Sequence, residues 1–299
     1  MLLSIDNLKF DLGKFKLRVE HVDIPAGRNF VMGHNGSGKT TLLKLICGIY
    51  NLSDGSIEMN GALLNHIPPW ERKISYIPQE LMLFPNMSVE KNLRFSIEHG
   101  KGNGEIYRQL VSELNISELL GRRPAELSGG QAQRVALARA VISDPDIVLM
   151  DEPLSMQDQA SRLSILSHLE GLMEKYSFSI IYVTHDQTDL DFGFDSLTFM
   201  DMGRVIETVK GLEEISHMTS MSMLRFGNAI TVDGSYYEVN DDSIYFSDRN
   251  GYGFQYWKNP DYYIYQIKID REEFFIRSTK PPLGKLINFD HGKMRRMNQ

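Results

Sequence analysis

Two hydrophobic patterns divide this chain. Up to about residue 210, short apolar runs that suit buried strands alternate with stretches in which apolar residues recur at helical spacing. The runs that we predict to be strands are 29–33, 74–77, 147–150 and 179–183. Alternating strands and helices are typical of an α/β domain in which helices cover a largely parallel sheet.

Helical spacing is clearest after Asp158, where apolar residues recur every three or four positions. These residues are Leu163, Leu166, Leu169 and Met173. Such spacing places them on one face of a helix, which is typical of packing on a core and carries no chemistry. Shorter helical stretches are predicted at 41–48 and 132–142.

The pattern changes near residue 220, beyond which eight of the 13 tyrosines lie. Aromatic and β-branched runs at 243–246, 262–265 and 274–276 are separated by Gly, Asn, Asp and Pro. This is typical of short antiparallel strands joined by turns. We therefore predict an α/β domain at 1–211 and a small β-rich domain at 212–299.

Composition narrows the class of protein. A length of 299 residues suits two domains, and 42% hydrophobic residues suffice for a core. The net charge of -7 argues against a nucleic-acid partner. The single cysteine, Cys47, cannot form an intramolecular disulfide, and its apolar neighbours predict a buried structural thiol. Since we find neither a membrane-spanning apolar run nor a signal peptide, we expect a cytosolic chain that reaches a membrane only through a partner.

The segment Gly33–Thr40 fits the phosphate-binding pattern G-x-x-x-x-G-K-[ST] between a predicted strand and a predicted helix. Its glycines let backbone N–H groups face the phosphates, and the helix N-terminus adds positive potential. Lys39 would neutralise phosphate oxygens, and the Thr40 hydroxyl would bind Mg²⁺. A chance glycine turn is the alternative, which the strand–loop–helix context disfavours. The residues expected to bind nucleotide here are Gly33, His34, Asn35, Gly36, Ser37, Gly38, Lys39, Thr40 and Thr41.

An acidic pair ends the predicted strand at 147–150. Asp151 and Glu152 would stand at the carboxyl edge of the sheet, beside the phosphate loop. Asp151 suits a magnesium role, and Glu152 suits polarisation of an attacking water. Such a pair alone is weak evidence, because any loop needs polar residues, but next to a phosphate loop it is strong.

A third motif, Leu127–Gln131, opens the helical stretch at 132–142. A serine followed by two glycines at a helix start can bind an anion, although by itself it indicates only an ordinary cap. Here the motif ends 20 residues before Asp151. Its position between the phosphate loop and the acidic strand is what indicates a functional role for this motif.

Taken in order, these motifs resemble those of ABC transporter ATP-binding subunits over residues 1 to about 210. Two further pieces match that family: Gln79 in Tyr-Ile-Pro-Gln and His185 in Val-Thr-His-Asp. The resemblance implies a P-loop cassette with a RecA-like core, an antiparallel β subdomain and an α-helical subdomain at about 80–142. It also implies ATP and Mg²⁺ as cofactors.

The resemblance supplies roles for the residues. Two copies of the chain would pair head to tail, so that each ATP lies between one copy's phosphate loop and the other's signature. The implied sets are Glu152, His185, Gln79 and Lys39 for catalysis; Thr40, Gln79 and Asp151 for Mg²⁺; and Ser128, Gly129, Gly130, Gln131 and Asp158 for the partner's ATP.

One segment departs from the family pattern, and the adenine-stacking residue has two candidates. The segment that usually reads Ser-Ala-Leu-Asp is Ser-Met-Gln-Asp at 155–158, with Met156 and Gln157 at the changed positions. The adenine-stacking aromatic is expected to be Phe10, which lies 29 residues before Lys39. Phe15 is the rival, and either could instead be a core residue.

Residues 80–89 resemble a segment of binding-protein-dependent importers, and such importers often append an OB or TOBE module. The segments 226–234 and 286–290 would be its first and last strands; a β-rich dimerisation domain is the alternative. The resemblance implies permease subunits and an extracytoplasmic binding protein as partners, at the cytoplasmic face of the membrane. Molybdate or tungstate is the expected cargo, with sugar, polyamine or metal import as alternatives. A soluble ABC protein acting on nucleic acid or ribosomes, or a module without hydrolysis, is disfavoured.

Overall fold

The computed structural model describes residues 2–153, 159–184, 189 and 193–210, together with the strands of the C-terminal part. The chain divides into two compact units, Met1–Leu212 and Glu213–Gln299. Each unit is described by itself below. Among the described residues, no helix combines the length and the hydropathy that crossing a bilayer requires.

The first unit is built on one ten-stranded sheet of order β5-β4-β1-β2-β10-β9-β3-β8-β7-β6. Its strands are β1 (Leu3–Leu12), β2 (Phe15–Ile24), β3 (Arg28–Met32), β4 (Asp54–Met59), β5 (Ala62–Leu63), β6 (Ile74–Ile77), β7 (Ile147–Asp151), β8 (Ser179–Thr184), β9 (Ser196–Asp201) and β10 (Arg204–Val209). The four strands predicted from apolar runs are β3, β6, β7 and β8.

The sheet is mixed, with a parallel part that includes the four predicted strands and an antiparallel part that agrees with the predicted antiparallel β subdomain. Strands β6, β7, β8, β3 and β9 run parallel, whereas β1 pairs antiparallel with β2 and β4. The antiparallel part forms because β1 and β2 are adjacent in the chain and are joined by a two-residue turn. Parallel neighbours need a long crossover, which the helices provide.

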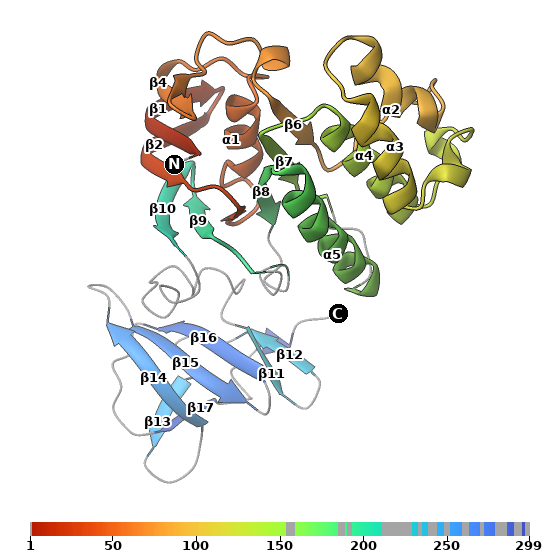
Figure 1. Cartoon of the computed structure of the whole chain (residues 1–299). Helices are drawn as coiled ribbons and strands as arrows, with labels where there is room; N and C mark the ends of the chain where they lie inside the picture. The colour runs from red at the N-terminus through yellow and green to blue at the C-terminus, as the bar shows by residue number, and fades with distance from the viewer. Residues whose placement is uncertain are drawn as a thin grey trace. The chain divides into compact units, whose positions relative to one another are not determined.

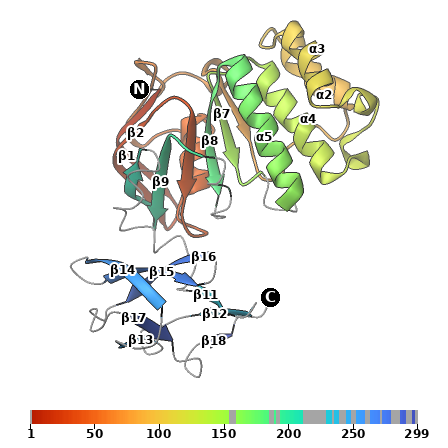
Figure 2. The ribbon, with the colours of Figure 1, turned by 60° about the horizontal axis from the view of Figure 1, so that its bottom comes forward.

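The described residues of this unit form five α-helices: α1 (Lys39–Ile46), α2 (Val89–Glu98), α3 (Gly104–Glu113), α4 (Gly129–Ile142) and α5 (Gln159–Tyr176). Figure 1 shows α2, α3 and α4 gathered to one side of the sheet, and Figure 2 shows α5 alongside β7 and β8. Leu166 and Leu169 of α5 are buried, as their spacing predicts. Short 3₁₀ turns lie at Pro69–Glu71, Ser117–Leu119 and Pro124–Glu126.

Polar residues set the starts of α2 and α3. The Ser88 hydroxyl caps α2 by accepting from the Lys91 N–H at 3.3 Å, and the Asn103 side chain accepts from the Glu105 N–H at 2.9 Å to cap α3. Such caps satisfy N–H groups that have no partner within the helix. The bounds of these helices are therefore encoded locally.

The main core lies between α1 and the sheet. Leu42, Leu43 and Ile46 of α1 are at most 1% exposed. Cys47 follows them and is 5% exposed, so the prediction of a buried thiol is confirmed. Burial raises the pKa of this thiol, which keeps it protonated and unreactive. This packing fixes α1, and with it the loop that precedes it.

The second unit consists of antiparallel pairs. Its strands are β11 (Ala229–Val232), β12 (Ser235–Glu238), β13 (Ile244–Ser247), β14 (Tyr252–Lys258), β15 (Tyr263–Ile269), β16 (Glu272–Ser278), β17 (Leu286–Phe289) and β18 (Arg295–Arg296). They form sheets of order β11-β12-β18 and β13-β17-β14-β15-β16. The segment at 286–290 is not the last strand, because β18 follows it and pairs with β12. The OB or TOBE assignment stays a prediction.

Candidate functional site

The predicted phosphate loop joins the end of β3 to the start of α1. Gly33, Gly36 and Gly38 have φ angles of 153°, 82° and 106°. A Cβ atom on Gly33 would lie 2.1 Å from the Met200 carbonyl oxygen, and one on Gly38 would lie 2.8 Å from the Phe15 ring. Gly33 and Gly38 therefore require glycine for space as well as for backbone conformation, whereas Gly36 requires it for backbone conformation alone.

Lys39 is the first residue of α1, and its side chain folds back over the loop. Its ammonium group donates to the carbonyl oxygens of Gly33 at 2.8 Å and His34 at 3.1 Å. The group also lies 3.9 Å from a Glu152 carboxylate oxygen. Burial lowers the pKa of Lys39, whereas Glu152 and Asp151 raise it and so favour the charged form. The loop thus holds a buried cation at its centre.

Asp151 ends β7 and is held by hydroxyl groups from two other elements. One carboxylate oxygen accepts from the Thr40 hydroxyl at 3.0 Å, and the other accepts from the Tyr76 hydroxyl at 2.9 Å. Burial and the Asp151 charge raise the pKa of Tyr76, so its hydroxyl stays a donor. Sequence reasoning missed Tyr76. Its sequence position could have indicated a place near the site, because Tyr76 stands three residues before Gln79 on a predicted strand.

Glu152 leaves the strand in a left-handed conformation with φ of 48°, while its N–H donates to the Val183 carbonyl at 3.0 Å. A left-handed residue after a strand turns the chain sharply and is uncommon for non-glycine residues. The turn separates the two carboxylates. Asp151 points at Thr40, and Glu152 approaches Lys39.

These groups line one cavity of about 420 Å³. Its lining consists of Leu12, Phe15, Asn35, Gly36, Gly38, Lys39, Thr40, Thr41, Gln79, Asp151 and Glu152. Most residues expected to bind nucleotide or act on it are therefore together. Of the predicted loop residues, Gly33, His34 and Ser37 do not line it, and Ser37 is buried at 2% exposure.

The two candidate adenine-stacking residues are in different places. Phe10 is 8% exposed, and its ring stacks on Tyr50 with centroids 5.2 Å apart. Phe15 lines the cavity, and its ring lies over Gly38. The position of Phe10 is that of a core residue, so the arrangement favours Phe15.

The oxygen atoms of Thr40 and Asp151 fit a magnesium ion. Hydroxyl and carboxylate oxygens are the ligands that Mg²⁺ prefers, and these two lie 3.0 Å apart at the phosphate loop. Gln79 lines the same cavity and adds an amide oxygen. The donor set therefore agrees with a bound Mg²⁺.

The signature segment forms a capping box at the start of α4. The Ser128 hydroxyl accepts from the Gln131 N–H at 3.3 Å, and the Ser128 N–H donates to the Gln131 side chain at 3.0 Å. Ser128 and Gly129 are exposed, and neither they nor Gly130 and Gln131 line the cavity of their own chain. Asp158, the altered residues Met156 and Gln157, and His185 lie outside the described residues.

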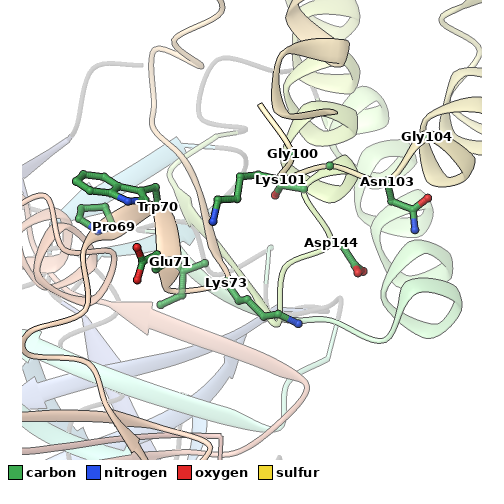
Figure 3. A pocket seen from close by; sticks show the side chains of 12 residues that line it. Pro69, Trp70, Glu71, Lys73, Gly100, Lys101, Asn103, Gly104 and Asp144 are labelled. Carbon is green, nitrogen blue, oxygen red and sulfur yellow. The ribbon is translucent and has the colours of Figure 1, made fainter. Parts of the chain in front are cut away.

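A larger cavity of about 950 Å³ lies elsewhere on the first unit, and Figure 3 shows the residues that line it. It borders Ile74 at the start of β6 and Asp144 before β7. Gln79 lies just beyond the other end of β6 and Asp151 at the other end of β7, and the phosphate loop follows the parallel strand β3. Its charged side chains are Glu71, Lys73, Lys101 and Asp144, and it includes no residue of the phosphate loop. The smaller cavity is therefore the candidate site.

Comparison with known proteins gives a consistent group of relatives. A family model described as ABC transporter matches residues 19–155. The chain is 36% identical over 204 residues to the molybdate/tungstate import ATP-binding protein WtpC of Archaeoglobus fulgidus, covering 67% of this chain and 83% of that protein. It is also 36% identical over 211 residues to the maltose/maltodextrin import ATP-binding protein MalK of Yersinia pestis, covering 69% of this chain. The chain spans only 54% of the length of this maltose import relative.

Solved structures give the same picture of the fold. An ATP-binding cassette of an ABC transporter aligns with a TM-score of 0.64 at 26% identity, covering 75% of this chain and 96% of that one. A nucleotide-free cassette from an ABC transporter aligns with a TM-score of 0.62 at 23% identity, covering 73% of this chain and 95% of that one. At that identity the second match bears on the fold alone.

Proposed function

This chain belongs to the ABC transporter family, among its import ATP-binding proteins, and on that premise we propose that it binds ATP and hydrolyses it to drive solute uptake through a membrane permease. The observation that carries the proposal is the meeting of Lys39, Thr40, Asp151 and Glu152 at one cavity. A buried cation, a hydroxyl and two carboxylates are the groups that phosphoryl transfer to water requires.

Binding would begin at the phosphate loop. The β- and γ-phosphates would lie against the N–H groups from Gly36 to Thr40, and Lys39 would exchange its loop carbonyl contacts for phosphate oxygens. Phe15 would stack on the adenine at the rim. When bound by Thr40, Gln79 and Asp151, Mg²⁺ would withdraw charge from the phosphate oxygens.

Hydrolysis would use Glu152 as the group that orients the attacking water. Its carboxylate lies 3.9 Å from the Lys39 ammonium, so a water between Glu152 and the γ-phosphate would meet an acceptor on one side and a cation-polarised phosphorus on the other. Gln79 and His185 would contact the water or the γ-phosphate. The products would be ADP and inorganic phosphate.

The site would be completed by a second copy of the chain. Ser128, Gly129, Gly130, Gln131 and Asp158 would serve the ATP held by that copy, which agrees with an exposed signature that does not line its own cavity. A head-to-tail homodimer would then close when ATP binds and would move permease subunits at the cytoplasmic face of the membrane. A substrate-binding protein would deliver the solute from outside.

For the cargo, we propose molybdate or tungstate. The support is that this chain covers 83% of the molybdate/tungstate relative but 54% of the maltose relative, at equal identity. Uptake of labelled molybdate into vesicles that contain the assembled transporter would test this, with tungstate, maltose and spermidine as competitors. Competition by tungstate alone would support molybdate or tungstate as the cargo. Uptake of a sugar, a polyamine or a metal in place of the oxyanion would contradict this proposal.

Replacement of the proposed water-orienting residue tests the ATPase. In Glu152→Gln, turnover should fall roughly 10²- to 10⁴-fold, because the amide cannot take a proton from water. ATP should still bind, so that size-exclusion chromatography shows an ATP-dependent dimer. Phosphate release and the elution volume are the measurements.

Two variants serve as controls. Lys39→Ala should lose both binding and turnover, whereas Glu71→Gln, which alters a carboxylate in the other cavity, should change neither. Full turnover in Glu152→Gln would refute the proposed function.

A further inference from the structure

Gln133 lies on the inner side of α4, on a face that also carries buried apolar residues. It is 7% exposed, and Ala136 and Leu137, which follow at helical spacing, are 2% and 3% exposed. Its side-chain amide donates to the carbonyl oxygen of Pro153 at 2.5 Å. Pro153 directly follows Glu152, so this bond joins α4 to the backbone of the chain's own catalytic loop.

Packing does not account for a glutamine at this position. The carbonyl oxygen of its side chain is buried and accepts no hydrogen bond from the residues that the structure describes. A buried polar atom left unpaired lowers stability, whereas methionine would fill nearly the same volume without that penalty. What the amide provides and an apolar side chain cannot is the bond to Pro153.

The two ends of this connection act on different nucleotides in the proposed dimer. Gln133 stands five residues after Ser128 in the chain, and both belong to the same rigid helix, Ser128 as its cap. Ser128 would contact the partner's ATP, while Glu152 would act on the ATP of its own chain. The bond from Gln133 to Pro153 therefore connects the helix that carries Ser128 to the loop that carries Glu152.

We propose that Gln133 is a positioning residue that couples the two ATP sites. A shift of α4 when the signature engages the partner's ATP would pass through Pro153 to Glu152, and the reverse shift would follow by the same bond. This inference rests on the proposed function and adds a route for cooperativity between its two sites.

The first test replaces Gln133 with methionine, which keeps length and volume and removes the donor. We expect kcat for ATP hydrolysis to fall roughly 10-fold with KM for ATP changed less than about twofold, because Glu152 is misplaced while the phosphate loop is intact. The Hill coefficient for ATP should fall toward 1. Gln133→Leu, which also lacks a donor, should behave in the same way.

The matched control is Leu137→Ala, which removes packing one turn further along the same face of α4. It should lower thermal stability and leave the Hill coefficient at the wild-type value. Equal loss of cooperativity in Leu137→Ala would mean that α4 packing alone is responsible, and the proposal would fail. An unchanged Hill coefficient in both Gln133 variants would also overturn it.

Mixed dimers with two affinity tags separate coupling from local positioning. In the first, a Gln133→Met subunit is paired with a Glu152→Gln subunit, so that the only active Glu152 is in the chain that carries Gln133→Met. In the second, one chain carries both changes and its partner is wild type, so that the active Glu152 belongs to the partner. The reference for both is the mixed dimer of wild type and Glu152→Gln.

Coupling predicts that both mixed dimers are slower than the reference. Slowing of the first alone would show that Gln133 positions only its own Glu152, which contradicts the proposal, as would no slowing in either. Failure of the proposed function is distinguishable, because the reference dimer and the wild type would then show no hydrolysis that depends on Glu152.

Discussion

At the scale of single residues, Asp151 is oriented by donors from two separate elements. Thr40 comes from α1 and Tyr76 from β6, and each donates to a different carboxylate oxygen. Groups that hold a ligand in place often affect metal affinity as much as the ligand itself. We therefore expect the proposed magnesium site to depend on Tyr76, although Tyr76 would not contact the nucleotide.

Tyr76→Phe tests this dependence. Removing the hydroxyl frees one Asp151 oxygen, so we expect Mn²⁺ affinity in the presence of ATP to fall about 10-fold. Electron paramagnetic resonance of free Mn²⁺ measures the affinity independently of turnover. Tyr50→Phe is the matched control, because it deletes the same atom from a ring that stacks on Phe10. Equal Mn²⁺ affinity in Tyr76→Phe and wild type would contradict the role.

At the scale of elements, α4 connects three parts of the site. Its cap carries the signature, Gln133 reaches Pro153, and Arg139 reaches the segment that follows Gln79. The Arg139 guanidinium donates to the carbonyl oxygens of Leu81 at 3.1 Å and Met82 at 2.9 Å. Both of those residues have positive φ, at 56° and 43°. Arg139 therefore stabilises a backbone conformation that would otherwise be unfavourable.

Arg139→Met should loosen the segment after Gln79 more than the site itself. Loss of two charge-assisted hydrogen bonds should lower the free energy of unfolding by roughly 2–3 kcal/mol, measured by urea denaturation. Hydrogen exchange at 81–84 should accelerate, because Phe84 also loses the cation 5.4 Å from its ring. Arg108→Met, an exposed arginine on α3, is the control. Unchanged exchange at 81–84 would show that other contacts hold the segment.

At the scale of the whole molecule, the described residues that line the candidate nucleotide cavity all belong to the first of two compact units. A ligand stabilises only the part of a protein that binds it. The two units should therefore respond differently to nucleotide.

Scanning calorimetry of Glu152→Gln tests this with slow turnover. We expect two transitions, of which one rises by roughly 5–10 °C when Mg-ATP is at 100 times its Kd, since this ratio adds about 2.7 kcal/mol. The other should not move. In Lys39→Ala neither transition should respond. A single transition that moves as a whole would mean that the two units unfold together.

The sequence by itself determined the local pieces of this protein. The phosphate loop, the acidic pair after β7 and the capped start of α4 each depend on residues next to one another in the chain. Their types therefore specify backbone conformation, hydrogen bonding and charge at short range. The order of these pieces was enough to indicate the family and the position of the cavity lining, including Gln79.

Only the tertiary structure decided which distant residues meet. Phe10 and Phe15 have the same side chain, but the register of β1 against β2 pairs Phe10 with Leu17 and leaves Phe15 beside the turn. Burial then places Phe10 on Tyr50 and Phe15 at the cavity. Tyr76 and Gln133 acquired their partners in the same way, through pairing of β6 with β7 and packing of α4. Such contacts depend on strand order and helix position, which no short run of residues encodes.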